Sequence, residues 1–301
     1  MGFAALVQAV VAVVAPAPGP PQLPPLTARA KAALVVVSGL PAPRGVAGVL
    51  VQSFSRDLPR PRNALVLVDQ EGGTSSTFDG LPPGRAASSY TTERGAFASG
   101  RATGLALGRA GVDLDLAPVV DLRGGPLGSR HFARPALAFA FAAGLRAGGA
   151  GACVKHFPGL GTARVSTDES PHVRARFVPR EVGAFRRVVR KGIPCVMVGH
   201  AFYSSLGHRR ASFNPAAYRL LRGWGFEGVA VTDSLSVFGS PYAVFGALSA
   251  ARAGADLLLF THGPDAARAI RALVPLARHG LLDEHVARVL ALRRSLGLKR
   301  P

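Results

Sequence analysis

Short apolar segments that end in polar residues recur along this chain, and they constrain its fold more than any other feature. Segment 64–69 ends in Asp69, segment 152–156 ends in Lys155 and His156, and segment 229–233 ends in Asp233. A buried strand that ends in a charge loses free energy unless the charge has a partner, so packing alone does not explain these endings. Polar residues at the carboxyl ends of several strands are typical of a parallel α/β active site.

Eight apolar segments occur in all, and helical patterns of period 3.6 separate them from the third segment onward. This alternation predicts an α/β fold, a TIM-like (β/α)8 barrel, with a doubly wound open sheet as the alternative. The predicted strands are 33–37, 46–51, 64–69, 112–117, 152–156, 194–200, 229–233 and 255–260. The predicted helices are 97–109, 135–147, 180–190, 215–222, 242–252, 265–278 and 283–296.

The first two connections are too short for the outer helices of a regular barrel. Residues 38–45 separate the first two predicted strands, and residues 52–63 separate the next two. Parallel crossovers usually need a dozen or more residues and generally carry a helix. We therefore expect the first two outer helices to be shortened or missing, and the first strand to pair antiparallel or to leave the barrel.

The first 26 residues differ from the rest of the chain. Residues 3–14 are almost all apolar, Ala-Pro-Ala at 15–17 resembles a cleavage site, and a Pro-rich stretch follows to Pro25. The apolar run is too short to span a bilayer but suits the core of a signal peptide, although no positive residue precedes it. We predict a signal peptide and linker over 1–26 and a single barrel over 27–301, with a disordered start or a misassigned first codon as alternatives. A secreted or cell-envelope location follows, with a cytoplasmic one as the alternative, and we expect no stable membrane insertion.

The formal net charge of +19 would suit a nucleic-acid-binding protein, but the distribution of the charge argues against one. The arginines scatter over predicted helical faces and are not interleaved with aromatic residues. We expect no nucleic-acid partner, whereas a basic surface favours anionic polymers such as cell-wall material. Lysine is rare in this arginine-rich chain, so Lys155 at a strand end indicates that a compact ammonium is needed there.

The two cysteines, Cys153 and Cys195, lie in apolar strand-like segments. By strand alternation Cys153 shares a face with Lys155, whereas Cys195 lies on the face opposite His200. We therefore expect the two side chains to face different layers, as buried thiols without a disulfide.

Six motifs with polar residues occur in the order in which a known enzyme family carries them. With these motifs the chain resembles, over roughly Val46 to Phe260, the catalytic barrel of glycoside hydrolase family 3, and within it bacterial β-N-acetylglucosaminidases that trim cell-wall sugars. The resemblance implies a retaining hydrolase of β-linked sugars that needs no cofactor and is a monomer with a carbohydrate substrate. The motifs are VDQEGG at 68–73, GVDLDLAPVVD at 111–121, GSRHF at 128–132, KHFPGLG at 155–161, MVGH at 197–200 and GFEGVAVTDSLS at 225–236.

The resemblance also implies roles for the polar residues of these motifs. Asp233 matches the nucleophile, the carboxylate that forms a covalent glycosyl-enzyme in retaining hydrolysis. His200 is equally consistent with a buried structural histidine. We expect Glu71 to brace the Gly-Gly turn rather than to meet substrate, and Asp115 and Asp121 to hydrogen-bond the barrel rim. The residues that match sugar-binding positions are Asp69, Arg130, Lys155, His156 and His200.

The proton donor is where the sequence departs from this resemblance. In the acetylglucosaminidase branch, an Asp-Ser-His dyad places its histidine thirteen residues after the motif lysine. Here that position holds Asp168, and Ser166 takes the place of the dyad's aspartate. Either Asp168 serves directly as the acid, or the loop shifts and His172 or Glu169 takes over. An aspartic acid donor needs a raised pKa, which the nearby Lys155 would oppose.

Two further departures bear on the function. The segment 74–78, Thr-Ser-Ser-Thr-Phe, replaces an arginine-bearing stretch that usually follows the DQEGG motif in this branch. Both β-glucosides and N-acetyl sugars are therefore candidate substrates. His156, His172 and His200 lack the spacing of a zinc site, and no glycine-rich phosphate loop stands out. The lost dyad and the short first connections favour the alternative of a catalytically degenerate barrel that binds cell-wall glycans without turnover.

Overall fold

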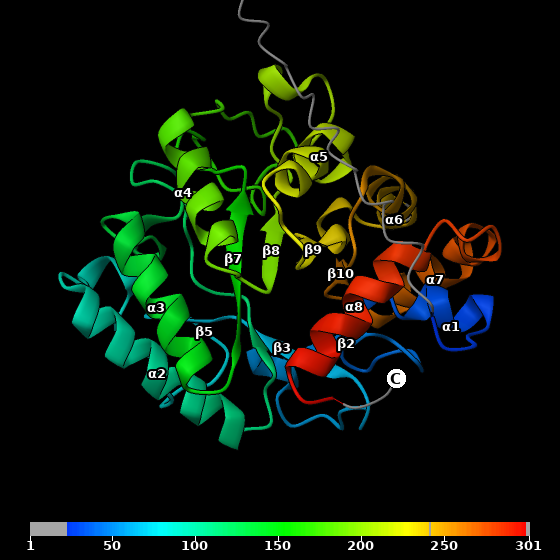
Figure 1. Cartoon of the computed structure of the whole chain (residues 1–301), viewed down its shortest axis with the longest axis horizontal. Coiled ribbons are helices and arrows are strands. Elements are labelled where there is room, and N and C mark those ends of the chain that lie inside the picture. Colours follow the sequence, from blue (N-terminus) through cyan, green and yellow to red (C-terminus); the bar gives the residue numbers. More distant parts are fainter. Residues whose placement is uncertain (1–22, 241, 299–301) are drawn as a thin grey trace, which may run out of the picture.

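A parallel eight-stranded sheet forms the centre of the computed structural model, which describes residues 23–240 and 242–298 (Figure 1). The strands follow the order β10-β1-β2-β3-β6-β7-β8-β9. A bridge between Val231 and Leu257, and a 2.9 Å hydrogen bond from the Thr232 N–H to the Leu257 carbonyl, bring β9 against β10 and nearly close the barrel. The TIM-like barrel is thereby confirmed over the open sheet. The apolar run 3–14, predicted as a signal peptide, lies outside the described residues.

Each predicted strand and helix corresponds to an element of the barrel or of its outer layer. The α/β connections place the helices outside the sheet, as Figure 1 shows. The strands are β1 Val36–Gly39, β2 Gly48–Leu50, β3 Leu65–Val68, β6 Leu114–Asp115, β7 Gly151–Phe157, β8 Cys195–Val198, β9 Val229–Thr232 and β10 Leu258–Phe260, with a hairpin of β4 Gln70–Gly72 and β5 Ser75–Ser76. The helices are α1 Ala28–Ala33, α2 Glu93–Arg109, α3 Pro135–Ala147, α4 Pro179–Arg190, α5 Pro215–Gly223, α6 Tyr242–Ala253, α7 Gly263–Arg278 and α8 Asp283–Ser295.

The first two connections carry no α-helix, as predicted, and the second holds only a single 3₁₀ turn, Ser53–Ser55. The expectation that the first strand pairs antiparallel or leaves the barrel is wrong. Strand β1 pairs parallel with both β10 and β2. The strands here are only four and three residues long. Because eight extended residues reach about 26 Å and a four-residue strand spans about 13 Å, a short connection can return to the start of the sheet without a helix.

Helix α8 covers the amino-terminal end of the barrel. Its Val289 and Leu292 pack into the same buried cluster as the inward side chains of the strands, and in Figure 1 the helix crosses in front of the sheet. The Arg293 guanidinium donates to the Ala47 carbonyl at 2.7 Å and to the Asn63 carbonyl, just before β2 and β3. The opposite end, where the strands finish, is therefore left to form a site.

The prediction of two free thiols is wrong, because Cys153 and Cys195 form a disulfide with an S–S distance of 2.01 Å. The two residues are register partners on the adjacent parallel strands β7 and β8, and both side chains lie in the barrel interior. The prediction assigned the face of Cys195 by counting the alternation of strand faces as far as His200. Strand β8 ends at Val198, so the alternation of faces does not extend to His200.

Candidate active site

A cavity of about 400 Å³, which we call the mouth cavity, opens where the strands end. Asp69 follows β3, Lys155 and His156 lie in β7, and Asp233 follows β9. These four residues line the cavity together with Arg130, from the 3₁₀ turn Gly128–Arg130, and Asp168, from the loop after β7. The structure thus brings together most of the side chains that the sequence nominated. His172 and His200 are the predicted site residues that do not line this cavity.

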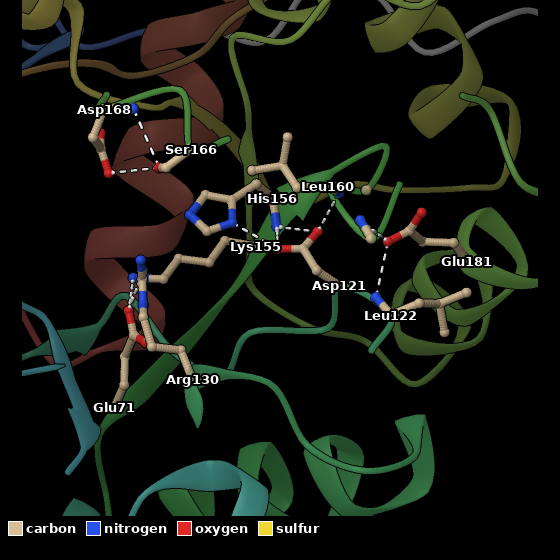
Figure 2. A network of polar contacts seen from close by, with 12 residues as sticks. Glu71, Asp121, Leu122, Arg130, Lys155, His156, Leu160, Ser166, Asp168 and Glu181 are labelled. Carbon is tan, nitrogen blue, oxygen red and sulfur yellow. Dashed lines mark hydrogen bonds and ion pairs between the residues drawn. The ribbon is translucent and has the colours of Figure 1, made fainter. Parts of the chain in front are cut away.

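Two cations and two carboxylates form a connected cluster on one side of the cavity, and Figure 2 shows three of its members, Glu71, Arg130 and Lys155. The Lys155 ammonium contacts Asp69 Oδ1 and Glu71 Oε1, both at 2.6 Å. Arg130 holds Glu71 with two parallel hydrogen bonds, from Nε at 2.9 Å and from Nη2 at 2.8 Å. A bidentate pair of this kind fixes both side chains in orientation. Asp69 is the half-exposed member of the cluster, so its second oxygen is available to a ligand.

Glu71 plays a larger part than the sequence predicted. Its side chain is 3% exposed and joins Lys155 to Arg130 instead of bracing the Gly-Gly turn. Burial alone would raise its pKa, but Lys155 and Arg130 outweigh this and lower the pKa to about 2. Burial likewise opposes the charge of Lys155, and Asp69 and Glu71 more than compensate, so the pKa of Lys155 is raised. At neutral pH Glu71 and Lys155 are therefore both ionised.

His156 is oriented by Asp121, beneath the rim of the cavity. The His156 Nδ1 lies 2.7 Å from Asp121 Oδ2, and the same carboxylate accepts the N–H groups of His156 and Leu160. The peptide bond between Lys155 and His156 is cis. Because a buried carboxylate that accepts an imidazole N–H sets the tautomer, the other ring nitrogen is the one left for a ligand. Asp121 hydrogen-bonds the rim, as predicted.

Glu181 is a positioning residue that the sequence reasoning missed. It lies in the first turn of α4, is fully buried, and through Oε1 accepts the N–H groups of Leu122 and Gly161, each at 2.8 Å. Burial raises its pKa to about 7. A Cβ on Gly159 would lie 2.1 Å from the Glu181 carboxyl carbon, so the glycines of the PGLG motif make room for this side chain. Those glycines were the available signal in the sequence.

A second buried carboxyl lies under the ionised cluster. Asp115 Oδ1 accepts the Gln70 N–H at 2.9 Å, which agrees with the predicted role at the rim, and Oδ2 has no hydrogen-bond partner among the described residues. Burial, together with the charges of Asp69 and Glu71, raises the pKa of Asp115 to about 8. The carboxyl of Asp115, which lies under the ionised cluster, is therefore mostly protonated at neutral pH.

Asp233 faces the mouth cavity from the end of β9. Its Oδ1 accepts the Ser234 N–H at 2.8 Å, and its own N–H donates to the Val198 carbonyl at 3.0 Å. Burial acts to raise the pKa of Asp233, but His200, His156, the Ser234 N–H and Lys155 together lower it below the ordinary value. An ionised carboxylate held at a strand end can act as a nucleophile.

His200 is buried beside Asp233 without reaching the cavity. Its Nδ1 lies 2.8 Å from Ser212 Oγ, and its Nε2 lies 3.0 Å from the Ser234 carbonyl, so both ring nitrogens are engaged. Since a carbonyl only accepts, Nε2 carries a proton and Nδ1 can accept from the Ser212 hydroxyl. Burial lowers the pKa of His200, which favours the neutral ring. In this structure His200 holds the backbone next to Asp233.

The two leading candidates for the proton donor differ in the cavities that they line. Asp168 is exposed, accepts a 3.3 Å hydrogen bond from Ser166 Oγ, and lines the mouth cavity (Figure 2). His172 is exposed in the same loop but faces a different, larger cavity. Glu169 faces that larger cavity as well. Of the three residues considered from the sequence, Asp168 is the one that the fold brings to the mouth.

Comparison with known proteins identifies the family to which this chain belongs. The model of the glycosyl hydrolase family 3 N-terminal domain matches residues 49–292. The chain belongs to glycosyl hydrolase family 3. It is 33% identical over 230 residues to a β-hexosaminidase of Methylococcus capsulatus, and this match covers 68% of this chain and 69% of that protein. It is 31% identical over 257 residues to a β-hexosaminidase of Chromobacterium violaceum, and this match covers 76% of this chain and 72% of that protein. The chain is thus a glycosidase.

Solved structures of family members share the barrel. A glycoside hydrolase family 3 β-N-acetylglucosaminidase from a Paenibacillus species superposes with a TM-score of 0.81 at 25% identity, over 91% of this chain and 63% of that one. A β-N-acetylhexosaminidase from Beutenbergia cavernae gives a TM-score of 0.77 at 26% identity, over 89% and 98%. Within the described ranges, no three His, Cys, Asp or Glu side chains are grouped to hold a metal ion, and no helix could cross a membrane.

Proposed function

We propose that this family member is a retaining β-N-acetylhexosaminidase that works through a covalent glycosyl-enzyme on Asp233. The observation that carries the proposal is the placement of an ionised Asp233 in the same cavity as the Asp69–Lys155–Glu71–Arg130 cluster. Retaining hydrolysis needs a carboxylate below the anomeric carbon and hydrogen-bonding groups that grip the sugar hydroxyls. Charged groups that are already oriented by their partners lose little entropy when the sugar binds.

In the proposed first step, an Asp233 oxygen attacks the anomeric carbon while the glycosidic oxygen leaves with its bonding electrons and takes a proton from Asp168. In the second step, Asp168 accepts a proton from water, whose oxygen attacks the anomeric carbon and displaces Asp233. Asp69, Arg130, Lys155 and the free nitrogen of His156 would hold the hydroxyls. Asp168 is assigned as acid and base because it lines the cavity that holds Asp233.

The N-acetyl sugar is proposed from the names of the relatives, which are β-hexosaminidases and β-N-acetylglucosaminidases. Residues 74–77 line the mouth cavity where the resemblance led us to expect an arginine, so a β-glucoside is the substrate to test beside it. An extracytoplasmic location is proposed as well. The disulfide supports it, because disulfides persist in oxidising compartments, and the +19 charge would favour anionic wall polymers there.

The decisive experiment is a search for the covalent intermediate. The purified protein is incubated with activated 2-fluoro β-glycosides, and peptide mass spectrometry locates any added sugar. We expect the sugar on Asp233, and we expect Asp233→Asn to lose turnover by several orders of magnitude while it still binds sugar. Asp57→Asn is the matched control, because Asp57 is 96% exposed and outside the site. Binding without adduct or turnover in the wild-type chain would favour a non-catalytic sugar-binding barrel.

A further inference from the structure

A cavity of about 350 Å³, which we call the loop cavity, lies along the segment that joins β6 to α3. The 3₁₀ turn Gly128–Arg130 belongs to this segment and carries Arg130 into the mouth cavity, but no residue that lines the loop cavity lines the mouth cavity. The proposed hydrolysis therefore gives the loop cavity no role. Its lining residues are Ser88, Arg123, Gly128, Ser129, His131 and Ala133.

His131, in the GSRHF motif, is a buried histidine that the site described above does not use. Its side chain lines the loop cavity, the residue is 8% exposed, and Nδ1 is buried without a hydrogen-bond partner among the described residues. The nearest comparisons are His156 and His200, whose Nδ1 atoms have partners at 2.7 and 2.8 Å. A buried polar atom without a partner costs free energy, so a ligand that accepts from this imidazole would offset that cost. No hydrogen bond to a described residue fixes which ring nitrogen carries the proton, so the ring can serve as a donor in the cavity.

The backbone around His131 is held in place by its neighbours. His131 forms a parallel bridge with Val119, which follows β6. The next residue, Phe132, packs its ring between those of Tyr90 and Phe141, at centre-to-centre distances of 5.7 and 5.6 Å. A donor on a fixed backbone loses little entropy when a ligand binds to it.

Two backbone features add partial positive charge near the loop cavity. Leu127 has a right-handed helical conformation and Gly128, which lines the cavity, has a φ of +56°, in the left-handed region. This succession turns consecutive N–H groups toward one side, as in anion-binding nests. The 13-residue helix α3 begins at Pro135, which lines an adjoining cavity of about 220 Å³. The positive end of its dipole therefore faces the same region.

The side-chain charges of the two cavities are mostly positive. Arg123 lines both cavities, and Arg134 and Arg180 line the adjoining one. No ion pair joins any of these guanidinium groups to a carboxylate within the described residues. Among those residues, Asp121 is the one carboxylate that lines either cavity, and its oxygens already accept the hydrogen bonds of His156. Three guanidinium groups against one carboxylate leave a net charge of +2 without any charge on the histidine.

We propose that the loop cavity is a binding site for a phosphoryl group, either free phosphate or a phosphate monoester. Arg123 and His131 would donate to the phosphoryl oxygens, and Ser88 and Ser129 offer hydroxyl groups from the wall. A phosphate monoester carries a charge of about −1.5 to −2 at neutral pH, which complements the positive walls. Its oxygens also point in several directions and can reach donors on different walls, whereas a carboxylate offers two oxygens in one plane.

Calorimetry on the whole chain at neutral pH tests the site with inorganic phosphate, glycerol 3-phosphate and acetate. We expect phosphate or its ester to bind one to one with a Kd of about 1 mM or tighter, and acetate at least about tenfold more weakly. Arg123 is exposed, so Arg123→Gln should fold normally and weaken phosphate binding by about tenfold, the effect of one charge-assisted hydrogen bond. Arg186→Gln is the matched control, because Arg186 lies on the exposed face of α4 and lines neither cavity.

Histidine NMR locates the bound phosphate. The ring-proton signal that is missing in His131→Phe belongs to His131, and it should shift when phosphate is added to the wild-type protein but not to Arg123→Gln. The readout is binding, so it is independent of the hydrolysis proposed above. Tighter binding of glycerol 3-phosphate would identify an esterified ligand, and tighter binding of phosphate a free one.

Four results would overturn the site. They are no binding of either phosphate compound up to about 10 mM, acetate binding as tight as phosphate binding, an unshifted His131 signal at saturation, and equal weakening in Arg123→Gln and Arg186→Gln. The last result would mean that phosphate responds only to the overall charge of the protein.

Discussion

Replacing Glu71 by glutamine tests whether the ionised cluster stabilises this barrel as its geometry indicates. The pKa of Glu71 falls from 4.5 to about 2 because Lys155 and Arg130 outweigh the opposing effect of burial. A shift of that size corresponds to about 3 kcal/mol of stability from ionised Glu71 at neutral pH. Removing one partner of a buried ion pair costs about 3–5 kcal/mol, which agrees. We expect the lower figure, since Lys155 keeps Asp69 and a glutamine oxygen can still accept from Arg130.

The sign of the pH dependence follows from the direction of the shift. A lowered carboxyl pKa adds stability above the unfolded pKa of about 4.5, and that stability is lost as the pH falls toward 2. The glutamine variant has no such dependence at this position. The gap between the two proteins should therefore be about 3 kcal/mol at pH 7 and about 1 kcal/mol smaller at pH 3.5.

Urea unfolding followed by the fluorescence of Trp224, the single tryptophan, measures both gaps. Glu227→Gln is the matched control, because Glu227 is exposed and forms no ion pair with any described residue, and it should change stability by less than about 0.5 kcal/mol. A Glu71→Gln loss below about 1 kcal/mol at pH 7, or an equal loss at pH 3.5, would refute the reasoning, because either result means that the buried charge is not held by its partners.

Three further predictions concern the loop, the proton donor and the disulfide. The pKa of Glu181 is raised to about 7, so the wild-type protein should lose up to about 3 kcal/mol of stability as the pH rises from 4.5 to 8. In urea titrations, Glu181→Gln should flatten this dependence of stability on pH. An unchanged dependence would exclude Glu181 as its source. Asp168→Ala should slow hydrolysis of glycosides with poor leaving groups by about 10²–10⁴-fold and recover with azide on activated aryl glycosides, whereas His172→Ala should behave as wild type; azide rescue of His172→Ala alone would reverse this assignment. Cys153→Ser with Cys195→Ser should cost about 4 kcal/mol, as estimated for a 42-residue separation, and thiol alkylation of the wild type without reductant should find no free cysteine in the unfolded chain.

Much of the architecture was predictable because it is written in local patterns. The spacing of apolar residues within a segment indicates which of its faces is buried, and therefore whether it is a strand or a helix. The predicted strands and helices accordingly agree with the structure to within a few residues, and α3 begins at Pro135 as predicted. Helix starts are equally local: Asn214 caps α5 through a 3.0 Å hydrogen bond to the Ala216 N–H. The strand-end positions of Asp69, Lys155 and Asp233 also predicted a common cavity, because parallel strands present their carboxyl ends on one side.

The pairings between distant residues were decided by the tertiary structure. The parallel pairing of β1 depends on strand lengths in space, and the disulfide depends on the register of β7 against β8, neither of which the alternation of apolar residues specifies. Glu71 meets Arg130 across 59 residues, and Glu181 reaches the loop residue Gly161 from helix α4. The sequence determined which residues would be polar at the mouth. Which of them are paired, buried and ionised followed only from the distances that folding sets, because electrostatic interaction and desolvation depend on those distances.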